Sequence, residues 1–156
     1  MKRIITNAIY YLMYTNFGEY LVVKEYKKVV QSDPDLFSEI EDFILQIAAE
    51  SNLPEKKMNN LALAVDEASA NSMVHGNKRD KNKFVEIYVQ VFEDRLEITF
   101  KDQGNGFNPQ AVPDPTNSEN ILKESGRGIH IMRSFLDDLK FNFTPSGTEV
   151  TLVLNF

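Results

Sequence analysis

The chain contains no cysteine and no tryptophan. The absence of thiols excludes disulfides, thiolate catalysis and cysteine-ligated zinc, and it fits a cytoplasmic location. No stretch approaches the roughly 18 consecutive apolar residues that a membrane-spanning helix needs. Basic residues number 17 against 23 acidic ones, for a net charge of −6, so no excess of positive charge is present to cover a nucleic acid. We therefore expect a cytoplasmic protein that binds neither membranes nor nucleic acids. An anionic nucleotide is not excluded, because backbone N–H groups bind phosphate without net positive charge.

The N-terminal segment begins with the basic residues Lys2 and Arg3, and a mostly apolar stretch follows as far as Met13. A leader peptide has this order, but Asn7 interrupts the apolar stretch and no Ala-x-Ala-like cleavage site follows. We expect residues 1–18 to form an extra helix or strand that packs on the domain or on a partner. The total length of 156 residues suits one domain with a sizeable core.

The remaining chain is predicted to contain, in order, a strand, two helices, two strands, a loop, a third helix and two strands. Residues 19–30 are rich in β-branched and aromatic side chains, which predicts a strand. A capping residue and Pro34 predict a helix start near residue 33, and Pro54 separates this helix from a second one that ends at Gly76. The later elements are strands over 84–92 and 95–101, a loop over 103–125, a helix over 128–136, and strands over 140–143 and 149–156.

This order predicts an α+β fold with two layers. Strands joined by tight turns pair antiparallel, so the pattern is not a βαβ repeat. We expect one mixed, mostly antiparallel sheet with the helices packed on one face. The 103–125 loop is long for a compact domain, so we interpret it as a lid or binding segment.

Glu67 and Asn71 are one turn apart on the second predicted helix, so their side chains share a face. A carboxylate in this position can accept a proton from a water or hydroxyl group that attacks a substrate. An Asn carbonyl oxygen is a hard ligand of the kind Mg²⁺ prefers. Asp66 lies about 100° further round the helix and cannot share this face. On the helix alone, a solvated flank is the commoner interpretation of such a pair.

Asp102 ends a predicted strand and opens a Gly-x-Gly loop. A carboxylate there can accept a hydrogen bond from an exocyclic amine such as the amino group of adenine. Gly104 and Gly106 permit positive φ and a close approach of backbone to a ligand. An ordinary turn would use the same residue types, so the loop alone does not decide between the two interpretations.

A second pair of glycines, Gly126 and Gly128, precedes the last predicted helix. Backbone N–H groups at a helix start bind phosphate readily, and Arg127 could add a charged contact to the same phosphate. A flexible helix entry is the alternative for this pair. His75 and His130 are interpreted as structural, because no second metal-ligating side chain stands at ligand spacing.

Several other nucleotide and metal motifs are absent from the sequence. There is no Gly-x-x-x-x-Gly-Lys-Ser/Thr phosphate loop, and the third glycine of a dinucleotide fingerprint is missing. Pro113 stands where a calcium loop needs its bidentate glutamate. The lysine and His-Arg-Asp motifs of eukaryotic-type kinases are also missing.

Taken in order, the three candidate segments and the closing strand resemble the motifs of the GHKL ATPase superfamily, whose members share the Bergerat fold. Within it the chain is most similar to the bacterial anti-sigma factor serine kinases, as the short lid, the His75-Gly76 pair and the Asp137-Asp138 pair indicate. The resemblance covers residues 19–156 and so implies a single domain. The matching segments are Leu63–Asn77 (N box), Asp102–Phe107, Ser125–Met132 (glycine box) and Gly147–Val150.

The resemblance implies that ATP binds with Mg²⁺, that Asp102 contacts adenine, that Asn71 ligates the metal, and that Glu67 activates the acceptor hydroxyl. The acceptor would be a serine or threonine of a small anti-sigma factor antagonist. The same protein, as a homodimer, would hold a sigma factor inactive. The nucleotide-binding residues implied by the match are Asn71, Asp102, Gly104, Gly106, Ser125, Gly126, Arg127, Gly128 and Thr148.

Two alternatives to a protein kinase stay open at this point. One is a nucleotide-dependent binding switch that performs no phosphoryl transfer, although Glu67 favours transfer over this alternative. The other is the catalytic domain of a two-component histidine kinase, which we rank lower because the chain has no upstream dimerisation helices with a phosphoacceptor histidine.

Overall fold

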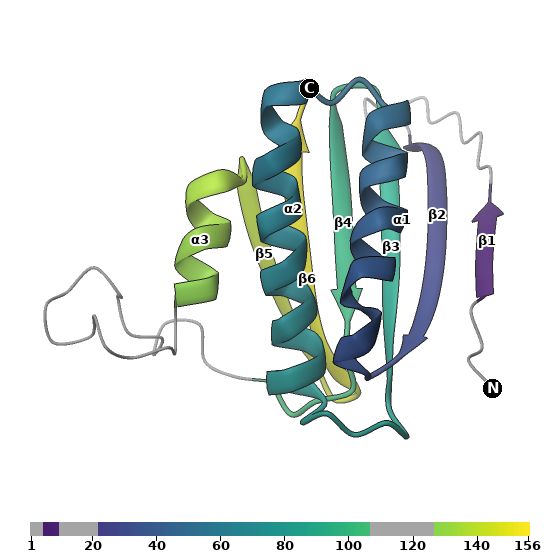
Figure 1. The fold of residues 1–156 in the computed structure, drawn as a ribbon, viewed down its shortest axis with the longest axis vertical. Coiled ribbons are helices and arrows are strands. Elements are labelled where there is room, and N and C mark those ends of the chain that lie inside the picture. The colour runs from purple at the N-terminus through teal and green to yellow at the C-terminus, as the bar shows by residue number, and fades with distance from the viewer. Residues whose placement is uncertain (1–4, 10–21, 107–126) are drawn as a thin grey trace, which may run out of the picture.

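The computed structural model describes residues 5–9, 22–106 and 127–156 (Figure 1). The predicted loop over 103–125 falls mostly outside these ranges, as do Ser125 and Gly126 of the glycine box. Residues 1–4 and 10–21 of the N-terminal part also lie outside the description.

A six-stranded sheet forms one layer of the molecule, with strand order β1-β2-β3-β4-β6-β5. Every neighbouring pair in the described sheet is antiparallel, so it is antiparallel throughout where the sequence had suggested a mixed sheet. β1 pairs with β2 at one edge and comes from the N-terminal extension. The strands are β1 (Ile5–Ile9), β2 (Val22–Gln31), β3 (Phe84–Phe92), β4 (Arg95–Lys101), β5 (Asp138–Thr144) and β6 (Gly147–Asn155).

The helices form the second layer and cover one face of the sheet (Figure 1). They are the short η1 (Pro34–Leu36), α1 (Phe37–Glu50), α2 (Glu55–Ala70) and α3 (Arg127–Phe135). The second predicted helix does reach Gly76, but its last six residues form a wider π-helical turn, η2 (Asn71–Gly76). The α+β fold with helices on one face is therefore confirmed.

Local sequence signals account for the boundaries of these elements. The Asp33 side chain accepts a hydrogen bond from the N–H of Asp35, and Pro34 occupies the first turn, so the predicted helix start is confirmed. The last two strands, predicted over 140–143 and 149–156, form a longer hairpin whose pairing runs from Asp138 to the turn at Gly147.

Period-two alternation directs apolar side chains of the sheet into one core beneath the helices. Along β3 and β4, buried residues alternate with partly exposed ones. Lys28 is the polar exception on this face of β2, where its Nζ lies 2.9 Å from Glu39 Oε1 of α1 and 5.0 Å from the centre of the Phe43 ring. The fully buried core includes Ile40, Ile44, Leu61, Met73, Ile87, Ile98, Phe100, Leu152 and Leu154.

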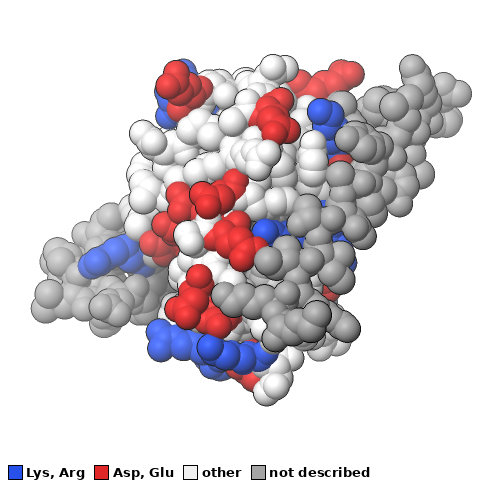
Figure 2. Space-filling model, turned by 45° about the vertical axis from the view of Figure 1, so that its right-hand side comes forward, with Lys and Arg blue, Asp and Glu red and all other residues white. Residues whose placement is uncertain are grey.

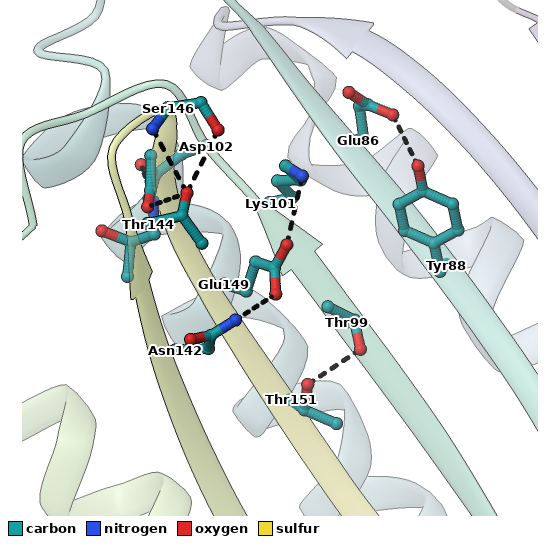
Figure 3. A network of polar contacts seen from close by, with 12 residues as sticks. Glu86, Tyr88, Thr99, Lys101, Asp102, Asn142, Thr144, Ser146, Glu149 and Thr151 are labelled. Carbon is teal, nitrogen blue, oxygen red and sulfur yellow. Dashed lines mark hydrogen bonds and ion pairs between the residues drawn. The ribbon is translucent and has the colours of Figure 1, made fainter.

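The opposite face of the sheet carries a ladder of polar contacts (Figure 3). Lys101 Nζ lies 3.1 Å from Glu149 Oε1, and Asn142 donates a 2.9 Å hydrogen bond to the other carboxylate oxygen of Glu149. Thr99 and Thr151 share a 2.8 Å hydrogen bond between facing hydroxyl groups. These contacts join β4, β5 and β6 across the face that no described helix covers.

Acidic side chains gather on the helical side of the molecule. In the space-filling view acidic groups extend from the top to the lower part of the visible face, and a group of basic side chains lies below them at the bottom (Figure 2). The pKa of Glu41 is raised, first by partial burial and then by the nearby carboxylates of Asp66 and Asp42. α1 and α2 thus bring like charges together, which is unfavourable for an approaching polyanion.

Candidate nucleotide site

Asp102 lies just past the end of β4 and is only 3% exposed. Its Oδ1 accepts hydrogen bonds from the backbone N–H of Gly104 at 2.8 Å and of Thr148 at 3.2 Å. Its own N–H donates to the carbonyl of Thr148 at 3.0 Å. Burial raises the pKa of this carboxyl, and the two backbone donors oppose that rise. One carboxylate oxygen is therefore held by the protein backbone.

Three glycines allow the chain to close around this carboxylate. A Cβ on Gly76 would collide with the Asp102 side chain, and a Cβ on Gly147 would collide with the Asp102 carbonyl. A Cβ on Gly104 would meet the carbonyl of Gly76. We call Asp102, Gly76, Gly104, Gly147 and Thr148 the Asp102 cluster. It joins the end of η2, the loop after β4, and the start of β6.

Asn77 fixes the loop that carries this cluster. Its side chain is fully buried, donates to the carbonyl of Phe84 at 3.0 Å and accepts from the N–H of Gln103 at 2.8 Å. The sequence predicts a helix end at Gly76, which the structure confirms, but it does not show that Gly76 and Asn77 also hold the loop that carries Asp102. No local signal separates a helix-ending Gly-Asn from one that also packs against a loop 26 residues later.

Glu67 and Asn71 lie at the junction of α2 and η2. Glu67 is half-buried, and its pKa is raised by burial and then by the adjacent Asp66, whereas His75 and Arg127 lower it. The Nδ2 of Asn71 is buried and has no hydrogen-bond partner among the described residues. Such an unsatisfied buried amide points to a group that the protein alone does not supply.

The start of α3 packs directly against Glu67. A Cβ on Gly128 would collide with Glu67 Oε2, so a side chain at this position would displace the carboxylate. Arg127, at the first position of the helix, is close enough to influence the pKa of Glu67. We call Glu67, Asn71, Arg127 and Gly128 the Glu67 cluster. Ser125 and Gly126, predicted to join it, lie outside the described residues.

A single continuous helical segment connects the two clusters. α2 and η2 carry Glu67, Asn71 and Gly76 in succession, with Glu67 against α3 and Gly76 against Asp102. Three motifs that are far apart in the sequence therefore meet along this one helical segment. His75, interpreted from the sequence as structural, belongs to this segment and is exposed.

Thr148 and Gly106 complete the Asp102 side of the site. The Oγ1 of Thr148 is buried and has no hydrogen-bond partner within the described part of the chain. Gly106 has a φ of 76°, which an L side chain rarely adopts, and a Cβ there would lie 3.4 Å from Thr148 Oγ1. The unpartnered hydroxyl beside the fixed carboxylate suits a ligand with several polar edge atoms, as a purine base has.

The residues present also fit a nucleotide-bound metal better than a metal held by protein alone. Among the described residues no group of three or more His, Asp or Glu could hold a metal ion. Mg²⁺ is commonly held by one or two protein oxygens together with substrate phosphates, and Asn71 is the hard oxygen ligand available in this site. None of the described helices is long and apolar enough to cross a membrane.

Comparison with known proteins agrees with this geometry. The family model described as the histidine kinase-like ATPase domain matches residues 30–154. The chain belongs to this family. Its members share an ATPase domain, so binding of ATP is implied for the chain. The matched range takes in both clusters and every described element except β1 and most of β2.

Named relatives resemble the chain over most of their length. The serine-protein kinase RsbW of Bacillus subtilis (strain 168) is 30% identical over 143 residues, which are 88% of this chain and 86% of that protein. The anti-sigma F factor of Clostridium perfringens (strain 13 / Type A) is 31% identical over 100 residues, or 62% of this chain and 71% of that protein.

A solved structure shares the fold. The histidine kinase domain from the Erythrobacter litoralis EL346 blue-light activated histidine kinase superposes with a TM-score of 0.51 over 80% of this chain. The chain spans 61% of that structure's length, and the two are 18% identical. This likeness shows the fold alone.

Proposed function

We propose that this protein is an ATP-dependent serine/threonine protein kinase of the anti-sigma factor type. In this proposal it phosphorylates a small antagonist protein and, as a cytoplasmic homodimer, holds a sigma factor inactive. The observation that carries the proposal is the Glu67 carboxylate, half-buried with a raised pKa and held against the start of α3. The names of the RsbW and anti-sigma F relatives support the same activity and partner.

The two clusters divide the work of binding ATP. Asp102 accepts a hydrogen bond from the adenine amino group through its free carboxylate edge, because Oδ1 is already engaged by backbone donors. Backbone N–H groups at the start of α3, together with Arg127, face the phosphates. Asn71 would hold Mg²⁺ through its carbonyl oxygen, and the metal would supply charge stabilisation for the phosphate oxygens.

Glu67 acts on the acceptor. Its carboxylate takes the proton of the serine or threonine hydroxyl as the hydroxyl oxygen bonds to the γ-phosphorus. The bond from that phosphorus to the β–γ bridging oxygen breaks, and ADP leaves. Burial first, and Asp66 second, raise the pKa of Glu67 and so make it a stronger base than an exposed glutamate, while the charges of His75 and Arg127 oppose this rise.

ATP binding and phosphoryl transfer test this proposal together. Calorimetry with and without Mg²⁺ should show binding of ATP that weakens when EDTA removes the metal. Transfer of radiolabelled γ-phosphate to candidate antagonist proteins should then follow, at a serine or threonine. Binding without transfer to any antagonist would favour the nucleotide-dependent switch. Absence of ATP binding would contradict the proposal outright.

A further inference from the structure

Phe143, near the end of β5, is a large apolar side chain that is 44% exposed. It pairs with Thr148 of β6, so the two side chains lie on the same, helix-covered face of the sheet. A Cβ on Gly106 would lie 2.8 Å from Cδ1 of the Phe143 ring. The ring therefore stands beside the loop that follows Asp102.

A second phenylalanine of the same strand, Phe141, contacts the Phe143 ring and supports its orientation. Phe141 and Phe143 stack with ring centroids 6.4 Å apart and planes inclined by only 4°. Phe141 itself packs against the core, so the pair forms a supported aromatic surface.

Phe143 is also linked to Asp102 through Thr148, its partner in the neighbouring strand. Its partner Thr148 donates its N–H to Asp102 Oδ1 and leaves Oγ1 without a partner in the described residues. An apolar ring, an unpartnered hydroxyl and a fixed carboxylate thus lie together where β6 begins. A purine needs these two kinds of surface, because its faces are apolar and its edges are polar.

We propose that Phe143 forms an aromatic wall of the base pocket, with its ring stacking on adenine while Asp102 binds the amino edge. This inference rests on the proposed ATP-binding function and names the group that receives the face of the base. Stacking on an aromatic side chain is tolerant of base identity, since every base has a π face. Phe143 would therefore contribute affinity for the purine, and Asp102 the preference for adenine.

The first test uses the absence of tryptophan from the chain. Phe143→Trp introduces a single tryptophan at the proposed wall, and its emission can be excited separately from that of the six tyrosines. ADP should quench its emission saturably, with a midpoint equal to the Kd from calorimetry, and inorganic tripolyphosphate should leave the emission unchanged. Calorimetric binding of ADP with no change in emission would overturn the proposal.

The second test distinguishes stacking of the Phe143 ring on the base from simple apolar contact with it. Phe143→Leu keeps an apolar side chain without a π face, and Phe143→Ala removes both. We expect both variants to lose about tenfold in ADP affinity, within the roughly 5- to 150-fold typical of base–aromatic stacking, while tripolyphosphate affinity is unchanged. The matched control is Phe84→Ala, which removes a phenylalanine that is 39% exposed on the other face of the sheet. Circular dichroism checks that each variant is folded.

The outcomes distinguish this inference from the proposed function. Unchanged ADP affinity in both Phe143 variants would overturn the aromatic wall and leave the kinase intact. Equal losses of ADP and tripolyphosphate affinity would also overturn it, because the ring would then act through the fold. If the unaltered protein binds neither ATP nor ADP, the proposed function fails first.

Discussion

The Asp102 and Glu67 clusters, at the two ends of one helical segment, are built in opposite ways. At Asp102 the backbone supplies two hydrogen bonds to one carboxylate oxygen, and three glycines close around it. At Glu67 the carboxylate is half-buried, and the neighbouring Asn71 amide nitrogen has no partner among the described residues. Under the proposed function, the surface for the base would be built in advance, and the surface for phosphate and metal would be completed by the ligand.

The sharpest way to test this contrast is to neutralise Glu67. Glu67→Gln keeps the size of the side chain but removes the base, so transfer should fall by about 10²- to 10⁴-fold, while ATP affinity stays nearly constant. The rate is measured under single-turnover conditions with saturating ATP and antagonist. The matched control is Asp66→Asn, which removes the adjacent but exposed carboxylate and should keep most of the rate. An undiminished rate in Glu67→Gln would remove this residue from the mechanism.

Substituting the glycines should show which cluster is rigid. Gly147 has a φ of 150°, and a Cβ there collides with the Asp102 backbone, so Gly147→Ala should lower the free energy of unfolding by about 2–4 kcal/mol. Gly128→Ala meets only the end of the Glu67 side chain, which can rotate away. That variant should keep its stability and lose transfer activity instead. Urea denaturation compares the two, and equal destabilisation would contradict the contrast.

Asp102→Asn changes the Asp102 cluster without changing the size of the side chain, so we expect a smaller effect than from the glycine substitutions. The asparagine Oδ1 can still accept from Gly104 and Thr148, which turns Nδ2 toward the base. A donor there opposes the adenine amino group and suits the 6-oxo group of inosine. We expect ATP affinity to fall by roughly tenfold or more, as for loss of a hydrogen bond to a charged group, and ITP affinity to rise relative to ATP. An unchanged ATP-to-ITP ratio would show that Asp102 does not contact the base.

The positions of candidate residues with a local sequence pattern could be predicted from the sequence. The one-turn spacing of Glu67 and Asn71, the strand-ending Asp102 and the glycine-led helix are all visible in short windows, and the structure places the described ones along or against α2 and η2. Their roles stay predictions. The α+β fold was likewise evident, because turn signals separate the strand runs and Pro54 divides the helices.

Residues that act through tertiary packing could not be predicted in this way. Gly76, Asn77 and Phe143 look like a helix end and an ordinary strand residue, and only the folded chain places them beside Asp102 and Gly106. The π-helical turn of η2 has the same origin, since its sequence continues the helical pattern of α2. The pairings of β1 with β2, of β2 with β3 and of β4 with β6 join strands that no tight turn connects, so the sequence did not show that these pairs are antiparallel too.

The pH dependence of transfer gives the smallest expected effect. Burial first, and Asp66 second, raise the pKa of Glu67 above the ordinary glutamate value of 4.5. A base works only when deprotonated, so kcat/KM should fall as pH decreases through this raised pKa. Asp66→Asn removes one cause of the rise and should move the acid limb to lower pH, whereas His75→Gln removes a cause that opposes it and should move the limb to higher pH. Shifts in these opposite directions would show that neighbouring side-chain charges set the pKa of Glu67, whereas backbone hydrogen bonds hold Asp102. An acid limb that stays in place in both variants would assign the titration to another group.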